Sequence, residues 1–376
     1  MRWVLNRLAL LALGLCAGFG WVTTIAAQSP HRMLTTSDAP REAERAIPLA
    51  LNWLARHQML DGRWSLDGFR SRCKDATCTG PGVGEPSKGD TGGTAMGLLP
   101  LLAAGQTHKS KGPYQANMQK GFDFLVAKQK ADGDLRGGGT MYSHGFAALA
   151  LCEAYALTQD KRLGAAAQKA INFIQSAQHK PSGGWRYQPD TPGDTSVFGW
   201  QLAALRSAEM AGLKVSGPCL DGARKYLKSA QAGEHGAKFS YVPGTPPTLS
   251  MTAVGLLCSQ RLGASNDSPQ IAAGAKYLLE HLPDATGMGQ RNAYYWYYAT
   301  QVLHNVGGPG WDTWHRTLRR TLIDTQAKEG CAAGSWDPGQ PVPEAWGVPG
   351  GRLMETSLST LALEVCYRYL QPDRAK

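Results

Sequence analysis

A short phrase recurs along this chain, and its recurrence constrains the fold more than any other feature. Each copy is a helical stretch ending in Gln, followed by a Gly-rich turn with an aromatic residue and then a helix of small residues. The clearest copies end in the pairs Gln58 and Trp64, Gln178 and Trp185, and Gln326 and Trp336; weaker ones follow Gln129 and Gln231. A period of roughly 50 residues is typical of identical supersecondary units that bury their faces against one another.

The helices of the repeat are of two kinds. The stretch that precedes each Gln carries apolar residues at helical spacing on one face, as in Ile171 and Ile174, and reads as an outer helix. The stretch that follows each turn is rich in Ala, Gly and Leu, as a helix buried on most sides should be. Six such pairs can be counted, although YLLEHLPDATGMGQ replaces the phrase in the fifth. We therefore predict an all-α protein, an α/α toroid of six inner and six outer helices, as one domain over residues 41–372.

The start of the chain has the features of an export signal. Arg2 and Arg7 precede an apolar run, and Ala26 or Ala27 offers a small residue for cleavage. Residues 1–27 are predicted to be a signal peptide and 28–40 a polar linker, which places the protein in the periplasm or cell envelope. The run from residue 8 to 27 is also long enough to span a bilayer, so an uncleaved anchor is the alternative.

The charge balance limits the classes of partner. With 39 basic and 29 acidic residues the formal net charge is +10, and the excess is spread over the predicted outer helices. A mildly basic exported protein can associate with an anionic membrane surface. No basic stripe with stacking aromatics and no zinc-finger spacing is present, so we expect no nucleic-acid partner.

The cysteines fall into different settings. Cys73 and Cys78 lie in a polar loop and could form a disulfide in an oxidising compartment. Cys152, Cys258 and Cys366 lie on apolar helical faces and are predicted to be buried. No C-x-x-C pair exists, which gives no support to a zinc ribbon or a thioredoxin-type site.

The Gln-to-Trp phrase resembles the repeat of squalene and hopene cyclases, whose toroid is shared by protein prenyltransferase β subunits. The resemblance covers roughly residues 41–370 and implies that the repeated Gln and Trp are structural. It also implies a pocket where the inner helices begin, suited to an apolar, isoprenoid-like ligand.

The catalytic motifs of that family are incomplete here. The cyclase signature Asp-x-Asp-Asp-Thr matches only at Asp194 and Thr195, and Gly193 occupies the position of the acid. The zinc ligands of the prenyltransferases have no counterpart, since Glu355 stands near the start of the last inner helix without a His. No metal and no cofactor are therefore expected, and the sequence leaves open whether the protein is an enzyme.

Several polar residues are candidates for the rim of the pocket. Asp194 and Asp90 begin inner helices, where each can cap the helix, line the cavity or do both. His144 with Tyr142 could act as base and acid, although a His hydrogen-bonded to a loop carbonyl is the alternative. Arg186 and Tyr187 follow Trp185 and could reach the same rim.

Aromatic residues are candidates for the wall of the pocket. Five adjacent aromatic residues, 294–298, cover every face of one predicted helix, so some of them must face outward. We expect Trp200, Tyr294 and Tyr297 to contact a ligand, with Glu355 nearby, and core packing is the alternative.

These observations leave three hypotheses for function. The first is a terpenoid-cyclase-like protein that binds an apolar ligand, and the second is a carbohydrate-active toroid, a lyase or hydrolase of the envelope. The third is a helical scaffold for protein partners. The repeat favours the first, while the export signal and the missing catalytic motifs favour the other two.

Overall fold

The computed structural model describes residues 40–80, 89–287 and 291–366, all within one compact unit, Thr35–Lys376. The predicted signal peptide, nearly all of the predicted linker and the end of the predicted domain after residue 366 lie outside these ranges. Among the helices in these ranges, none has the length and apolar character that a bilayer span requires.

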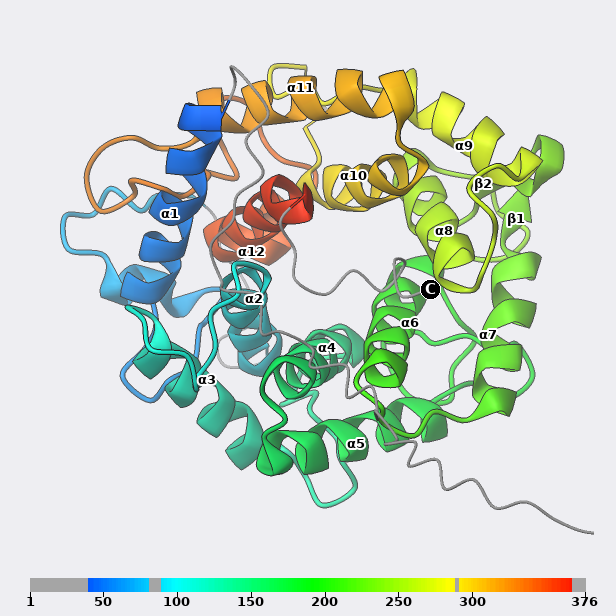
Figure 1. Cartoon of the computed structure of the whole chain (residues 1–376), viewed down its shortest axis with the longest axis horizontal. Helices are drawn as coiled ribbons and strands as arrows, with labels where there is room; N and C mark the ends of the chain where they lie inside the picture. Colours follow the sequence, from blue (N-terminus) through cyan, green and yellow to red (C-terminus); the bar gives the residue numbers. More distant parts are fainter. Residues whose placement is uncertain (1–39, 81–88, 288–290, 367–376) are drawn as a thin grey trace, which may run out of the picture. The chain divides into compact units, whose positions relative to one another are not determined.

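The described helices form two concentric rings (Figure 1). The outer ring consists of α1 (Pro40–Arg56), α3 (Gln115–Lys128), α5 (Lys161–Ser176), α7 (Gly217–Ser229), α9 (Pro269–Leu279) and α11 (Gly308–Thr325). The inner ring consists of α2 (Asp90–Ala103), α4 (Met141–Thr158), α6 (Thr195–Met210), α8 (Leu249–Arg261), α10 (Ala293–Val306) and α12 (Gly347–Leu363). Each inner helix contacts the next, and α12 contacts α2, so the ring is closed. The predicted all-α toroid is confirmed, including the fifth pair that lacks the phrase.

The burial of each helix follows from its ring. Every residue of α2 is buried, because the helix lies between its two inner neighbours and the outer ring. Outer helices bury only one face, as α11 does with Trp314, Leu318 and Leu322 at a spacing of four residues.

The repeated Gln ties its own turn to the next outer helix. Gln58 Nε2 donates to the carbonyl of Gly62 in the turn at 2.8 Å and to that of Asn117 on α3 at 2.9 Å. Corresponding bonds run from Gln129 to Gly133 and Ala166, from Gln178 to Gly183 and Cys219, and from Gln326 to Gly334 and Ala46. The bond from Gln326 reaches α1 and closes the outer ring.

The repeated Trp ties the turn back to the helix before it. Trp64 Nε1 donates to the carbonyl of Leu54 at 2.7 Å, and Trp185 and Trp336 make the same bond to Ile174 and Leu322. All three indoles are buried, so the structural role that the resemblance implied for the Gln and Trp residues is in place.

The fourth repeat contains a feature that the sequence did not predict. Its turn forms two short antiparallel strands, β1 (Gln231–Ala232) and β2 (Lys238–Phe239), around the 3-10 turn η2 (Glu234–Gly236). Gly233 and Gly236 adopt positive φ there, which lets the chain reverse within a few residues.

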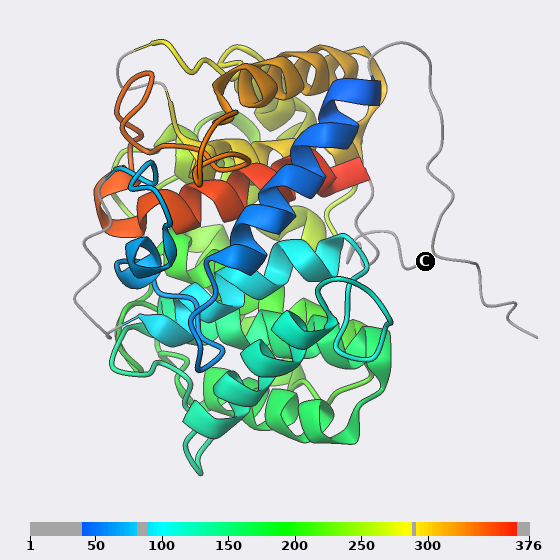
Figure 2. The same cartoon turned by 90° about the vertical axis from the view of Figure 1, so that its left-hand side faces the viewer.

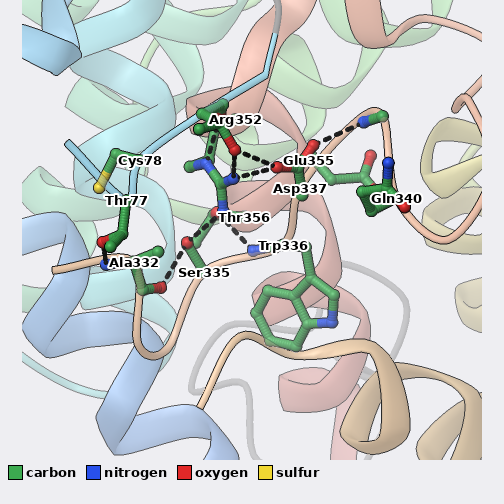
Figure 3. A network of polar contacts seen from close by, with 12 residues as sticks. Thr77, Cys78, Ala332, Ser335, Trp336, Asp337, Gln340, Arg352, Glu355 and Thr356 are labelled. Atoms are coloured by element: carbon green, nitrogen blue, oxygen red, sulfur yellow. Dashed lines mark hydrogen bonds and ion pairs between the residues drawn. The ribbon is translucent and has the colours of Figure 1, made fainter. Parts of the chain in front are cut away.

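The first and last repeats meet at a seam, where α1 lies over α2 and α12 (Figure 2). Arg352, near the start of α12, is 1% exposed and donates to the carbonyl of Thr79 at 2.8 Å. It also donates to the hydroxyl of Ser335 at 2.9 Å and pairs with Asp337 (Figure 3). The loop after α1 is therefore bound to the loop before α12.

Candidate ligand-binding site

The site begins at the first turn of α6. Asp194 is the N-cap of this helix, and its Oδ1 accepts a hydrogen bond from Val197 N at 2.8 Å. Thr195 anchors the same turn by donating to the carbonyl of Ser240 at 2.6 Å. The cap that the sequence predicted for Asp194 is confirmed, and it fixes the first turn of the helix, which contains Ser196 two residues after the cap.

Ser196 connects hydroxyl groups from three inner helices. Tyr142 of α4 donates to Ser196 Oγ at 2.5 Å, and the hydroxyls of Ser196 and Tyr294 lie 2.7 Å apart. Tyr294 belongs to α10, which is separated from α6 in the ring by α8. The contact therefore crosses the interior of the inner ring, and it brings together two of the predicted site residues.

Asp194 has a second oxygen that the cap does not use. Its Oδ2 lies 3.9 Å from Arg186 Nε, beyond hydrogen-bond distance. Burial raises the pKa of Asp194 to about 6, against the opposing effects of the capping N–H of Val197 and of Arg186. The carboxyl group thus changes its charge near neutral pH, as general acids in active sites often do.

Two tyrosines flank Arg186 at the solvent-exposed edge of the site. The hydroxyls of Tyr187 and Tyr241 are 2.6 Å apart, and the Arg186 guanidinium lies 6.0 Å from the centre of the Tyr187 ring. Tyr187 is 40% exposed, while Tyr142, 5.8 Å from it between ring centres, is half-buried. The rim predicted at Arg186 and Tyr187 is therefore open to solvent.

Below the hydroxyl chain, aromatic rings pack against one another. Trp200 stacks on Tyr297 with ring centres 5.4 Å apart, and it contacts Phe146 and Tyr294 at 4.3 and 6.5 Å. Trp200 and Tyr297 are at most 2% exposed, so they form the floor of the site and are covered by their neighbours. The indole N–H of Trp200 has no hydrogen-bond partner among the described residues.

His144 lies apart from this rim. It is fully buried, its Nδ1 accepts from Leu135 N at 3.0 Å, and its Nε2 faces the carbonyl of Ala170 at 3.0 Å. In other repeats a threonine of the inner helix accepts from the corresponding N–H of the turn: Thr94 from Trp64, Thr252 from Phe239 and Thr356 from Trp336. His144 therefore performs the repeat's structural task, and these contacts give no support to the catalytic role predicted for it.

Asp90 and Glu355 also have partners of their own. Asp90 is the first residue of α2, makes no capping bond, and pairs with Arg63 at 3.2 Å. Glu355 pairs with Arg291 at 2.7 Å, and both are about 1% exposed. Asp90 and Glu355 are each paired with an arginine of their own. Neither carboxyl group is in contact with Asp194 among the described residues.

The sequence missed a group of residues at the seam. The potential metal-binding atoms of His57, Cys73, Cys78 and Cys331 lie within 4.8 Å of one another. The sequence contains no C-x-x-C pair that would have indicated such a cluster.

All seven described cysteines are free, so no Cys73–Cys78 disulfide is formed. Cys152 and Cys258 are buried as predicted, but Cys366 is exposed because it lies in the 3-10 turn that ends the described chain.

Comparison with known proteins identifies the class of fold. No family model and no curated protein sequence matches this chain. Solved structures do match, and they have α/α toroid folds like that of the terpenoid cyclases.

Three structures illustrate the similarity. An α-1,6-mannanase from Salegentibacter sp. HEL1_6 is 14% identical, with a TM-score of 0.59 over 87% of this chain and 98% of the mannanase. The type II terpene cyclase MstE from Scytonema is 15% identical, with a TM-score of 0.56 over 87% of this chain and 97% of the cyclase. An α-amylase from Clostridium perfringens is 10% identical, with a TM-score of 0.58 over 88% of this chain and 100% of the amylase. At these identities the likeness establishes the fold alone.

Proposed function

We propose that this chain binds an apolar, isoprenoid-like small molecule with a polar end, at the starts of inner helices α4, α6 and α10. One observation carries the proposal. Aromatic side chains from these three helices meet inside the inner ring, and the hydroxyls of Tyr142, Ser196 and Tyr294 form a continuous chain at its rim.

The aromatic floor accounts for the apolar part of the ligand. A ligand that enters from the rim would rest on Phe146 and Tyr294, which pack on Trp200, and each apolar Å² that it buries contributes about 25 cal/mol. Phe146 and Tyr294 are 7% and 8% exposed, more than Trp200 and Tyr297 beneath them.

The rim accounts for the polar end. Hydroxyl groups can both donate and accept hydrogen bonds, and Asp194 supplies a further donor when it is protonated. Among the proteins that share the fold, MstE is known in complex with geranylgeranyl dihydroxybenzoate as substrate, a molecule that is apolar at one end and polar at the other. This resemblance supports the class of ligand.

The proposal includes action outside the cytoplasm, because the first residues have the features of an export signal. Cell fractionation with an antibody against the chain tests this part, and recovery in the cytosol alone would contradict it.

Binding can be tested by native mass spectrometry after exposure to a lipid extract, followed by titration of tryptophan fluorescence with geranylgeraniol. We expect Tyr294→Ala to weaken binding by about tenfold, because it removes both a ring and a hydroxyl. The control is Tyr277→Ala on outer helix α9, which should bind as the wild type does. No retained lipid and no fluorescence change would remove the proposal.

A carbohydrate-active function is the second candidate, and Asp194 is the reason. The carboxyl group of Asp194 is buried, has a pKa of about 6 and lies 3.9 Å from Arg186, whose neighbour Tyr187 is exposed. This arrangement suits a general acid that acts on a sugar stacked against the Tyr187 ring. The mannanase and the amylase that share the fold act on carbohydrates, as their names state. Release of oligosaccharides from mannan or starch by the wild type, and not by Asp194→Asn, would favour this candidate over the first.

A further inference from the structure

We infer that His57, Cys73, Cys78 and Cys331 bind one zinc ion, which joins the first repeat of the toroid to the last. The inference concerns the seam and does not depend on the ligand proposed for the rim. The sequence has no metal-binding motif at these residues.

The geometry of the four side chains suits a tetrahedral ion. His57 Nε2 lies 3.2 Å from Cys78 Sγ and 3.7 Å from Cys331 Sγ, and the four potential ligand atoms all lie within 4.8 Å of one another. Zn–S bonds of about 2.3 Å and Zn–N bonds of about 2.0 Å in a tetrahedron place ligand atoms roughly 3.5–3.8 Å apart. A modest rearrangement of the side chains is enough to reach this geometry.

The orientation of His57 leaves the correct nitrogen free. Its Nδ1 lies 2.8 Å from the carbonyl of Trp53 and donates to it, and the ring stacks on the Trp53 indole with centres 4.1 Å apart. The lone pair of Nε2 therefore points at the thiols. A backbone carbonyl that holds the second nitrogen is the usual support of a zinc-binding histidine.

The two loops that supply the cysteines are fixed to each other. Asp75 accepts hydrogen bonds from Thr77 through Oδ1 and from Cys331 N through Oδ2, the latter at 2.7 Å. Thr77 Oγ1 in turn accepts from Ala332 N at 3.0 Å, and both residues are visible in Figure 3. Cys331 is thereby held beside the loop that carries Cys73 and Cys78.

The charged groups around the cluster include three guanidinium groups and one carboxylate, that of Asp75, whose Oδ1 lies 3.6 Å from Cys73 Sγ. Binding of Zn²⁺ by one neutral imidazole and three thiols releases three protons to solvent and leaves a net charge of −1. Arg56, Arg72 and Arg352 lie close enough to His57 to act on its charge. These guanidinium groups offset the negative charge of the metal site.

The chemistry of the ligands selects the metal. Three soft thiolates and one imidazole in a tetrahedron are a structural zinc set, whereas calcium and magnesium require oxygen ligands. A Cys73–Cys78 disulfide would remove two of the four ligands and leave only His57 and Cys331 to bind a metal. With four ligands from the protein, no position remains for a substrate, so the ion is structural.

The first test is the metal content of the full chain, purified under reducing conditions without a polyhistidine tag and analysed by inductively coupled plasma mass spectrometry. We expect one zinc per chain, and after exchange with Co²⁺ an absorption spectrum of a tetrahedral thiolate site. Absence of stoichiometric zinc, or the mass of a Cys73–Cys78 disulfide in the native protein, would overturn the inference. This measurement needs no variant to fold.

The second test uses variants and a matched control. Cys331→Ser should lose the bound zinc and the thiolate-to-cobalt band, while Cys366→Ser, which changes an exposed cysteine outside the cluster, should keep both. A chelator should lower the Tm of the wild type and of Cys366→Ser but leave that of Cys331→Ser unchanged. Zinc retained at one per chain in Cys331→Ser would exclude Cys331 and, with it, the link between repeats.

Discussion

Asp194 and Asp90 occupy corresponding places in two repeats, yet their surroundings differ. Asp194 caps α6 with one oxygen and keeps the other in a buried position 3.9 Å from Arg186. Asp90 makes no cap and pairs with Arg63 at 3.2 Å. A carboxyl group that is buried with only a distant cation resists ionisation, and that resistance has a cost in folding stability.

This cost predicts a pH-dependent effect of Asp194→Asn. Because the pKa of Asp194 is raised to about 6, the folded chain holds this proton more tightly than the unfolded chain between roughly pH 4 and pH 6. The group therefore lowers stability as pH rises through that window, by about 3 kcal/mol at most. Asn keeps the cap without the charge, so the variant should gain stability relative to the wild type on going from pH 4 to pH 8.

Urea unfolding at both pH values measures this difference. The substitution also has an effect on the free energy of unfolding that does not depend on pH, such as a changed contact with Arg186. This effect cancels when the two pH values are compared. A gap between variant and wild type that is the same at pH 4 and pH 8 would show that Asp194 ionises as freely in the folded state as in the unfolded one.

At the scale of the elements, the turn of each repeat packs directly on the inner helix that follows it. A Cβ at Gly97 of α2 would lie 2.4 Å from Cδ2 of Trp64, and a Cβ at Gly255 of α8 would lie 2.1 Å from Cγ of Phe239. Only glycine fits at these two positions without displacing a neighbour, because an aromatic ring of the turn packs against the helix there. The abundance of glycine in the inner helices is a packing requirement.

Gly97→Ala should therefore destabilise the protein, although alanine is the better helix former. The clash with a fully buried indole costs about 1–3 kcal/mol, and the gain in helix propensity, at most about 1 kcal/mol, does not offset the upper part of that range. Gly217→Ala at the start of α7 is the control, since no atom lies within 4 Å of its Cβ position. Thermal unfolding of both variants measures the difference; equal Tm values would show that the indole moves aside freely.

At the scale of the whole fold, closure of the ring decides how stability is shared. Gln178 and Gln326 each donate two hydrogen bonds of 2.8–2.9 Å from a buried side chain, but only Gln326 joins the last outer helix to the first. In an open solenoid the end repeats fray and their contacts count for less. In a closed ring no repeat is terminal.

Gln178→Ala and Gln326→Ala should then destabilise the chain by similar amounts, about 1–3 kcal/mol each, because each leaves two backbone carbonyls without their donor. Gln119→Ala, which removes an exposed contact with Asp123, should have little effect. Urea unfolding followed by circular dichroism checks all three. A much smaller effect of Gln326→Ala, or a separate early transition, would mean that the seam opens independently of the rest.

The sequence by itself determined the fold and the local structure at several residues. The period of the Gln-to-Trp phrase predicted both rings, including the fifth pair without the phrase, because helical spacing and turn chemistry are local properties of the chain. The same local logic predicted the cap by Asp194 and placed Tyr142, Arg186 and Tyr187 near the beginnings of inner helices. At His144 the local pattern left a catalytic and a structural role open, and the contacts with Leu135 N and the carbonyl of Ala170 came only from the structure.

Only the tertiary structure decided which distant residues meet. Tyr294 reaches Ser196 across the ring interior, and Cys331 reaches His57, 274 residues away in the sequence, because ring closure brings the last turn beside the first. The predicted closure implied that these turns are neighbours, but the direction of a side chain depends on the packing around it. For the same reason the sequence suggested that Trp200 and Tyr297 contact a ligand, but it could not show that the two rings stack on each other.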